Sequence, residues 1–228
     1  MKIRRMLAGE LLLLLALSGS AWSAQTGAPA PAKAPVQASV VEGTDYVRIQ
    51  NGTPFATAAG RIEVAEFFNY ACPACNAFNP LLRSWQQSLP ADVHVVFVPM
   101  DFRPDFVQYA HAYYAAEALG VLERSHDAVY TAIHQTHKLP GEGGAQDPAV
   151  IAKFYAQFGV KAADFQSAMG SFSVNMKTTA ARQFAQRSQV ESTPTLVING
   201  RYRILGKSWP DMLRIASALV AEVRSGAR

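Results

Sequence analysis

The strongest constraint on the fold is a short apolar run that leads directly into two closely spaced cysteines. Residues 61–68, RIEVAEFF, are rich in β-branched and aromatic side chains, and the run ends at NYACPAC. A short run of this kind, bounded by a break in the pattern, predicts a buried strand. Cys72 and Cys75 are the only cysteines in the sequence, and we expect both to follow this strand immediately.

A helix is predicted to begin at or near Cys72. Pro73 suits its first turn, because the N–H group that proline lacks would be unpaired there in any case. Apolar residues then recur at the three- and four-residue steps of one helix face, namely Phe78, Leu81, Leu82, Trp85 and Leu89. Cys72 would therefore lie where free N–H groups and the positive end of the helix dipole converge, and both favour a thiolate. Cys75, one turn later, would be more buried.

The remaining pattern places strands on both sides of a long helical block. Further strands are predicted at residues 46–50, 93–98, 195–198 and 201–205, the last two joined in a hairpin by Asn199 and Gly200. Helical spacing dominates residues 105–188 and returns over residues 209–224. This order predicts an α/β sheet domain, residues 45–104 and 189–228, interrupted by an all-helical insertion, residues 105–188.

Residues 1–23 have the pattern of a secretory signal peptide. Positive charges precede a leucine run, and small residues suited to cleavage follow it. We expect cleavage after Ser23 or Ala24. An uncleaved membrane anchor is the alternative, although the apolar run is shorter than the roughly 20 residues that a membrane-spanning helix needs. Residues 24–44 are rich in Ala and Pro and predict a flexible leader.

The charge of the chain argues against a nucleic-acid partner. The sequence has 21 basic and 17 acidic residues, and these do not form blocks of one sign. Half of the residues are hydrophobic, which is enough for a packed core. We expect a monomer that is exported to a compartment where disulfides persist.

Three roles for the cysteine pair are open: metal ligands, a structural disulfide or a redox reagent. A zinc site needs three or four protein ligands, and the histidines that could add to the pair are His126, His134 and His137. We interpret these histidines as polar positions on an exposed helix face and predict no metal site. A structural disulfide is weakly supported, because so small a ring constrains the unfolded chain little. The strand before the pair and the helix after it favour redox chemistry.

Three features together resemble one known family. They are EFFNYACPAC at residues 66–75, STPT at residues 192–195, and the long helical block between them. These features are similar to those of the DsbA family of periplasmic thiol:disulfide oxidoreductases, and the likeness covers roughly residues 45–225. The resemblance implies a thioredoxin-like fold, with a central mixed β-sheet and an inserted all-helical domain.

The resemblance also implies roles for individual residues. Cys72 would be the attacking, substrate-linked cysteine, and Cys75 the resolving one. Glu66 would be the buried acid beneath the pair, and Pro194 a cis-proline facing the disulfide. The Thr193 backbone would lie beside the cysteines, where it could pair with an extended segment of substrate. No dissociable cofactor is implied.

The residue between Pro73 and Cys75 departs from the family pattern. Many members carry a histidine immediately before the second cysteine, and this sequence has Ala74. A lower thiol pKa stabilises the reduced form and makes the disulfide more oxidising. Because a partner for the thiolate is missing, we predict a less depressed Cys72 pKa and a milder oxidant.

The resemblance implies an enzyme that donates the Cys72–Cys75 disulfide to reduced secreted polypeptides, through a mixed disulfide at Cys72. A quinone-linked inner-membrane oxidase of the DsbB type would then restore the disulfide. One alternative is a periplasmic disulfide reductase or isomerase on the same scaffold. Another is a non-catalytic peptide-binding chaperone in which the disulfide is incidental.

Overall fold

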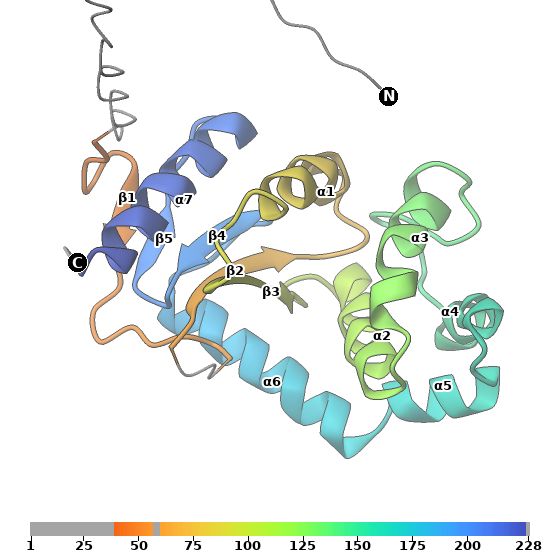
Figure 1. Cartoon of the computed structure of the whole chain (residues 1–228). Helices are drawn as coiled ribbons and strands as arrows, with labels where there is room; N and C mark the ends of the chain where they lie inside the picture. Colours follow the sequence, from red (N-terminus) through yellow and green to blue (C-terminus); the bar gives the residue numbers. More distant parts are fainter. Residues whose placement is uncertain (1–38, 57–59, 227–228) are drawn as a thin grey trace, which may run out of the picture. The chain divides into compact units, whose positions relative to one another are not determined.

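The computed structural model describes residues 39–56 and 60–226 (Figure 1). The signal peptide expected at residues 1–23, and the expected leader up to residue 38, lie outside the described residues. Val40 is buried, and the Val41 amide donates a 2.8 Å hydrogen bond to the Asp45 carboxylate. The packed chain therefore begins before residue 45, so the last residues of the expected leader belong to the folded structure.

Within the described residues, five strands form one mixed sheet in the order β1-β5-β4-β2-β3. The strands are β1 Tyr46–Arg48, β2 Ile62–Phe68, β3 Val93–Pro99, β4 Thr195–Ile198 and β5 Tyr202–Ile204. Strand β2 pairs in parallel with β3 and antiparallel with β4. All of its residues are buried, so the sheet is central and mixed as predicted.

The helices occur in the predicted order between and after these strands. They are α1 Pro73–Gln86, α2 Val107–Ala118, α3 Leu122–His134, α4 Pro148–Tyr155, α5 Ala162–Met169, α6 Phe172–Arg187 and α7 Trp209–Arg224. Short 3-10 turns occur at Pro104–Phe106 and Ala156–Phe158. No helix among these is long and apolar enough to cross a membrane.

Helices cover both faces of the sheet (Figure 1). On one face, Ile62 and Val64 of β2 belong to a buried cluster with Phe78 of α1 and Leu219 of α7. On the other face, α6 packs against the sheet. Helix α6 lies within the range predicted for the insertion, yet it also forms one of the two layers that bury β2.

The hairpin between β4 and β5 turns at Asn199 and Gly200, as predicted. Both residues have positive φ, 50° and 65°, the conformation that a two-residue hairpin turn needs. A Cβ atom at Gly200 would lie 1.9 Å from the Thr53 carbonyl oxygen. Glycine is therefore required there both for its backbone conformation and for the close approach of a second chain segment.

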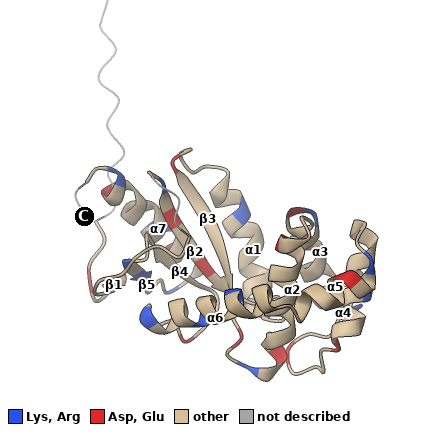
Figure 2. Ribbon diagram, turned by 90° about the horizontal axis from the view of Figure 1, so that it is seen from below, with Lys and Arg blue, Asp and Glu red and all other residues tan. Residues whose placement is uncertain are grey.

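Charged residues of both signs are scattered over the elements (Figure 2). Helix α1 carries a single charged residue, Arg83, in its last turn. The first turns of α1, where the cysteines lie, therefore have no charged side chain. Any charge that acts on the two thiols comes from other elements or from the last turn of this helix.

The packing of α6 against the sheet generates a stability prediction. The Phe184 ring is fully buried and stacks between Phe55 and Phe67, with ring centroids 5.1 and 5.0 Å away. We expect Phe184→Ala to lower the free energy of unfolding by about 3–5 kcal/mol, because it leaves a cavity between these rings. Urea denaturation followed by circular dichroism measures the change.

Phe172 provides the matched control on the same helix. Its side chain is 80% exposed, so Phe172→Ala should change the free energy of unfolding by no more than about 0.5 kcal/mol. Equal effects of the two substitutions would contradict the assignment of α6 to the layer that buries β2.

Candidate active site

The turn between β2 and α1 is held by the buried side chain of Asn69. Its Nδ2 donates to the carbonyl oxygens of Met100 (2.7 Å) and Phe106 (3.0 Å), and its Oδ1 accepts from the Ala71 amide (2.9 Å). Asn69 thereby ties the end of β2 to the segment that leads from β3 into α2. These hydrogen bonds therefore fix the position of Cys72, three residues later in the sequence, at the end of the sheet's central strand.

The two cysteines lie at the start of α1 in different environments. Cys72 is the N-cap residue of the helix, and its sulfur accepts a hydrogen bond from the Cys75 amide (3.4 Å). Pro73 is the first helical residue, as predicted. Cys75 is fully buried, whereas Cys72 is 7% exposed, and both are free thiols in this structure. Only Cys72 can be reached from outside.

The loop before β4 approaches Cys72 closely. The Thr193–Pro194 peptide bond is cis, as the resemblance implied. The Cys72 thiol donates to the Thr193 carbonyl oxygen, with 3.6 Å between sulfur and oxygen. Within the described residues, the Thr193 amide donates no hydrogen bond. An extended length of backbone with a free donor therefore lies beside the accessible sulfur.

The surroundings move the two thiol pKa values in opposite directions. A hydrogen bond from the Cys75 thiol, with further help from the backbone amides of Cys75 and Ala74, outweighs burial and lowers the Cys72 pKa to about 6. Burial raises the pKa of Cys75 well above its ordinary value, and the neighbouring Cys72 raises it further. At neutral pH the reduced pair holds a thiolate at Cys72 and a thiol at Cys75.

Glu66 lies on β2 and is 1% exposed. Burial, and secondarily the charge of Cys72, raise its pKa to about 8, while Arg83 acts to lower it. Its Oε1 atom accepts no hydrogen bond from the described part of the protein. Glu66 is therefore protonated at neutral pH. The resemblance implies a buried acid near the cysteines, and the burial of Glu66 is consistent with that role.

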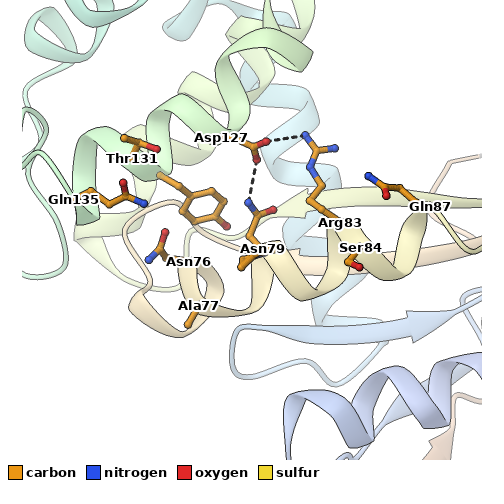
Figure 3. Close-up of a pocket in the computed structure, with 11 residues that line it drawn as sticks. Asn76, Ala77, Asn79, Arg83, Ser84, Gln87, Asp127, Thr131 and Gln135 are labelled. Atoms are coloured by element: carbon orange, nitrogen blue, oxygen red, sulfur yellow. Dashed lines mark hydrogen bonds and ion pairs between the residues drawn. The ribbon is translucent and has the colours of Figure 1, made fainter.

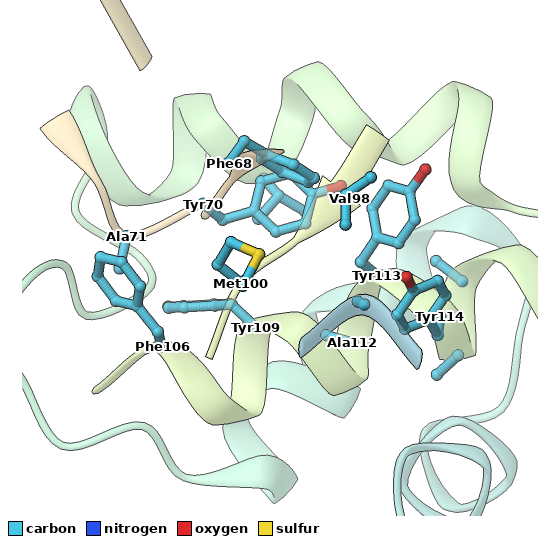
Figure 4. Close-up of a cluster of buried hydrophobic side chains, with 14 of the residues drawn as sticks. Phe68, Tyr70, Ala71, Val98, Met100, Phe106, Tyr109, Ala112, Tyr113 and Tyr114 are labelled. Atoms are coloured by element: carbon cyan, nitrogen blue, oxygen red, sulfur yellow. The ribbon is translucent and has the colours of Figure 1, made fainter. Parts of the chain in front are cut away.

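The interpretation of His126 as an exposed polar residue is wrong. Its side chain is 3% exposed, and its Nδ1 forms a 2.9 Å hydrogen bond with the Tyr70 hydroxyl. Both residues belong to an aromatic cluster with Phe68 and Tyr113, in which Figure 4 shows Phe68, Tyr70 and Tyr113 gathered above Met100. Burial lowers the His126 pKa to about 4, with Arg83 acting in the same direction, so the imidazole is neutral. Helical spacing cannot reveal this contact, because Tyr70 lies outside α3.

The His134 side chain binds the backbone of the same turn. The Nε2 atom lies 2.8 Å from the Tyr70 carbonyl oxygen, and it must donate, because a carbonyl only accepts. His137 is exposed but lies beyond the end of α3, so its interpretation as a helix-face position is wrong; its Nδ1 lies 3.1 Å from the Ile133 carbonyl oxygen of that helix. Among the described residues, no group of three or more His, Cys, Asp or Glu side chains could hold a metal ion.

Sequence reasoning missed the residues that hold the turn, namely Asn69, Tyr70, His126 and His134. The one available signal was the position of Asn69, a polar residue between a buried strand and the cysteine pair. The two histidines were noticed only as conceivable metal ligands. Their real partners lie 56 and 64 residues away in sequence, beyond the reach of local patterns.

Comparisons with known proteins give a consistent picture. A family model described as the DSBA-like thioredoxin domain matches residues 63–218. The thiol:disulfide interchange protein DsbA of Pseudomonas aeruginosa is 34% identical over 189 residues, which cover 82% of this chain and 87% of that protein. The protein of the same name from Burkholderia cepacia is 30% identical over 215 residues, or 93% of this chain and 95% of that protein.

A solved structure shows the same architecture. The crystal structure of the oxidoreductase DsbA from Xylella fastidiosa superposes with a TM-score of 0.77 at 40% sequence identity. The superposition covers 82% of this chain and 98% of that chain. The sheet, the cysteine helix and the helical block therefore have close structural counterparts in a protein of that name.

The lowered pKa of Cys72 generates a titration prediction. In the reduced protein, the ultraviolet absorbance of the thiolate should rise with a midpoint near pH 6, the value that the hydrogen bonds at Cys72 imply. Ala74→His should move the midpoint lower still, because it adds a partner that favours the thiolate. Cys72→Ser is the control and should remove this transition.

A midpoint as low as about 3.5, the value typical of strongly oxidising DsbA proteins, would contradict the prediction that Ala74 leaves the thiolate less stabilised. An unchanged midpoint in the Ala74→His protein would show that this position does not act on Cys72.

The raised pKa of Glu66 generates a prediction about stability and pH. In the reduced folded protein the carboxyl keeps its proton up to about pH 8, whereas in the unfolded chain it ionises near 4.5. The folded state therefore holds the extra proton, and its stability falls as pH rises through this window. Glu66→Gln should abolish that fall, a relative gain of about 4 kcal/mol between pH 5 and pH 8 at 1.36 kcal/mol per pH unit.

Denaturant unfolding of the reduced proteins at several pH values measures the difference. The groups facing Glu66, namely Cys72, Cys75, Arg83, Tyr113 and Tyr130, are retained in both proteins. Glu123→Gln, at an exposed position of α3, controls for the loss of one carboxylate. Parallel stability curves for the wild type and Glu66→Gln would contradict a protonated Glu66.

Proposed function

Because the chain belongs to the family of DsbA-like thioredoxin domain proteins and is a thiol:disulfide oxidoreductase, we propose that it donates a Cys72–Cys75 disulfide to reduced cysteines of exported proteins. The observation that carries this proposal is the asymmetry of the pair. Cys72 is the accessible thiol and has a lowered pKa, whereas Cys75 is buried and has a raised one. A stabilised Cys72 thiolate favours the reduced enzyme, and therefore favours giving the disulfide away.

The reaction has two exchange steps. A substrate thiolate attacks the Cys72 sulfur, the Cys72–Cys75 bond breaks, and Cys75 leaves as a thiolate. A second thiolate of the substrate then attacks the substrate sulfur in the mixed disulfide, and Cys72 leaves as a thiolate. The substrate loses two electrons and two thiol protons and gains a disulfide, and the enzyme takes up the two electrons and is left with a Cys72 thiolate and a protonated Cys75 thiol. No dissociable cofactor enters either step.

Glu66 supplies the proton that Cys75 needs when it leaves. Burial makes a thiolate at Cys75 unfavourable, and the charges of Glu66 and Cys75 act on each other. Since the Glu66 pKa is about 8, the carboxyl holds a proton at neutral pH and can give it up to a stronger base nearby. When the pair is oxidised again, the same carboxyl takes a proton back.

The backbone at Thr193 and Pro194 holds the substrate beside Cys72. The Thr193 amide is free and its carbonyl oxygen faces the Cys72 sulfur. An extended substrate segment can pair with this backbone as an added strand. Backbone pairing is independent of side-chain identity, which suits an enzyme that acts on many polypeptides.

The site of action is the periplasm. Residues 1–23 direct export and are removed after Ser23 or Ala24, and the mature protein works as a monomer. Its sheet domain comprises residues 45–104 and 189–228, and residues 105–188 form the insertion. A quinone-linked inner-membrane oxidase of the DsbB type restores the disulfide, because each turnover leaves the enzyme reduced and an external oxidant must take the two electrons.

Replacement of the accessible cysteine tests the function. We expect Cys72→Ser to abolish the oxidation of reduced polypeptides, both in cells and with the purified protein, because Cys75, the one cysteine left in the sequence, is buried and has no second thiol with which to form a disulfide. Cys75→Ser is the matched control: its Cys72 thiolate should attack disulfides of exported polypeptides, displace one of their sulfurs as a thiolate and stay linked as a mixed disulfide, visible on non-reducing gels, because the Cys75 thiol that would release the polypeptide is missing. Survival of cellular activity in Cys72→Ser would favour the chaperone alternative.

The redox equilibrium with glutathione separates a donor from a reductase. A reduction potential near that of thioredoxin, about −270 mV, would overturn the donor direction while leaving thiol exchange at Cys72 intact.

A further inference from the structure

A groove of about 620 Å³ lies between α1 and α3, and its lining on α1 starts at Asn76, the residue after Cys75. Figure 3 shows its two walls: Asn76 and Asn79 project from α1, Asp127 projects from α3, and Gln135 follows directly after the end of α3. This volume lies within the range of about 300–1,000 Å³ that is typical of ligand sites. The mechanism proposed above uses none of these side chains.

The groove carries no net charge. Its two charged residues, Arg83 and Asp127, pair with each other at 3.4 Å, and Asp127 also accepts a 3.0 Å hydrogen bond from the Asn79 side chain. The remaining lining is amide, hydroxyl, aromatic and aliphatic. Because the charges cancel, the groove favours a neutral polar occupant over an ion.

Several hydrogen-bonding groups in the groove lack a partner. Asn79 is 8% exposed, and its Oδ1 atom is buried without a hydrogen bond. In the part of the chain that the structure describes, no hydrogen bond reaches the side-chain amides of Asn76 or Gln135 either. A carboxamide both donates and accepts, so it complements a peptide group, which does the same. Asn76 is half-buried and Gln135 is exposed, so both of these side-chain amides are open to a bound peptide group.

We propose that this groove binds a segment of the substrate polypeptide that flanks the cysteine joined to Cys72. The inference rests on the proposed function, and it adds a second, non-covalent contact for the substrate. Asn76 lies one helical turn beyond Cys72, and its backbone N–H donates to the Cys72 carbonyl oxygen (3.1 Å). Four residues of helix span about 6 Å, a distance that an extended chain covers in about two residues. A substrate held at Cys72 therefore reaches the groove without rearrangement.

The chemistry of the groove defines the class of substrate. Carboxamides that pair with peptide groups read the backbone and not the side chains, so the groove accepts unfolded segments of varied sequence. Folded proteins, whose peptide groups are already paired, cannot enter. Small thiols such as dithiothreitol react at Cys72 without occupying the groove.

Competing substrates provide the test. The purified oxidised protein is given a long, reduced, unfolded polypeptide with one cysteine pair, or dithiothreitol, and the two second-order rate constants are compared as a ratio. Ser84→Trp, at an exposed lining position on α1, fills the groove and should lower the polypeptide-to-dithiothreitol ratio at least about tenfold, a loss of about 1.4 kcal/mol. Gln135→Ala removes one carboxamide and should lower the ratio about threefold, as expected for one hydrogen bond.

Leu81→Trp is the matched control, because Leu81 is an exposed residue of the same helix outside the groove lining. Its ratio should equal that of the wild type. An unchanged ratio in both groove variants would overturn the inference and leave the proposed function standing, and so would an equal loss toward both substrates. If the wild-type protein oxidises neither substrate, the proposed function fails, and the inference that rests on it fails too.

Discussion

The position of Cys72 depends on the buried carboxamide of Asn69. By accepting from Ala71 and donating to two carbonyl oxygens beyond β3, this side chain closes the end of β2 against the entry to the helical block. The next residue, Tyr70, is held by two histidines of α3, one through its hydroxyl and one through its carbonyl. Three side chains thus hold the turn from which α1 starts, so the helical block takes part in placing the thiols.

The same placement gives the two sulfurs their opposite properties. Cys72 caps the helix, where the Cys75 side chain and backbone amides can stabilise a negative charge, while Cys75 lies one turn inside the core. Glu66 lies on the central strand, and its burial keeps it protonated at neutral pH. The charges of these three groups act on one another, because Cys72 raises the pKa of both Glu66 and Cys75, and Glu66 raises the pKa of Cys75 further. The pKa values therefore belong to the arrangement as a whole.

Around this centre, the unpaired hydrogen-bonding groups lie where a polypeptide would pass. Within the described residues, the Thr193 amide beside Cys72 donates no hydrogen bond, and in the groove between α1 and α3 the side-chain amides of Asn76 and Gln135 make none. These groups lie on two sides of a reactive sulfur, which is the basis for the proposal that a substrate backbone binds beside it.

The sequence by itself determined the order of strands and helices, the position of the cysteines at a strand-to-helix junction, the Asn199–Gly200 hairpin and the family resemblance. All of these rest on local spacing or on contiguous motifs, which a chain carries before it folds. Only the tertiary structure decided that His126 is buried, that α6 covers the sheet, and that Asn69 and His134 hold the active-site turn. Those facts depend on contacts between residues more than 30 positions apart, and no local period encodes such contacts, because they arise only when separate elements pack together.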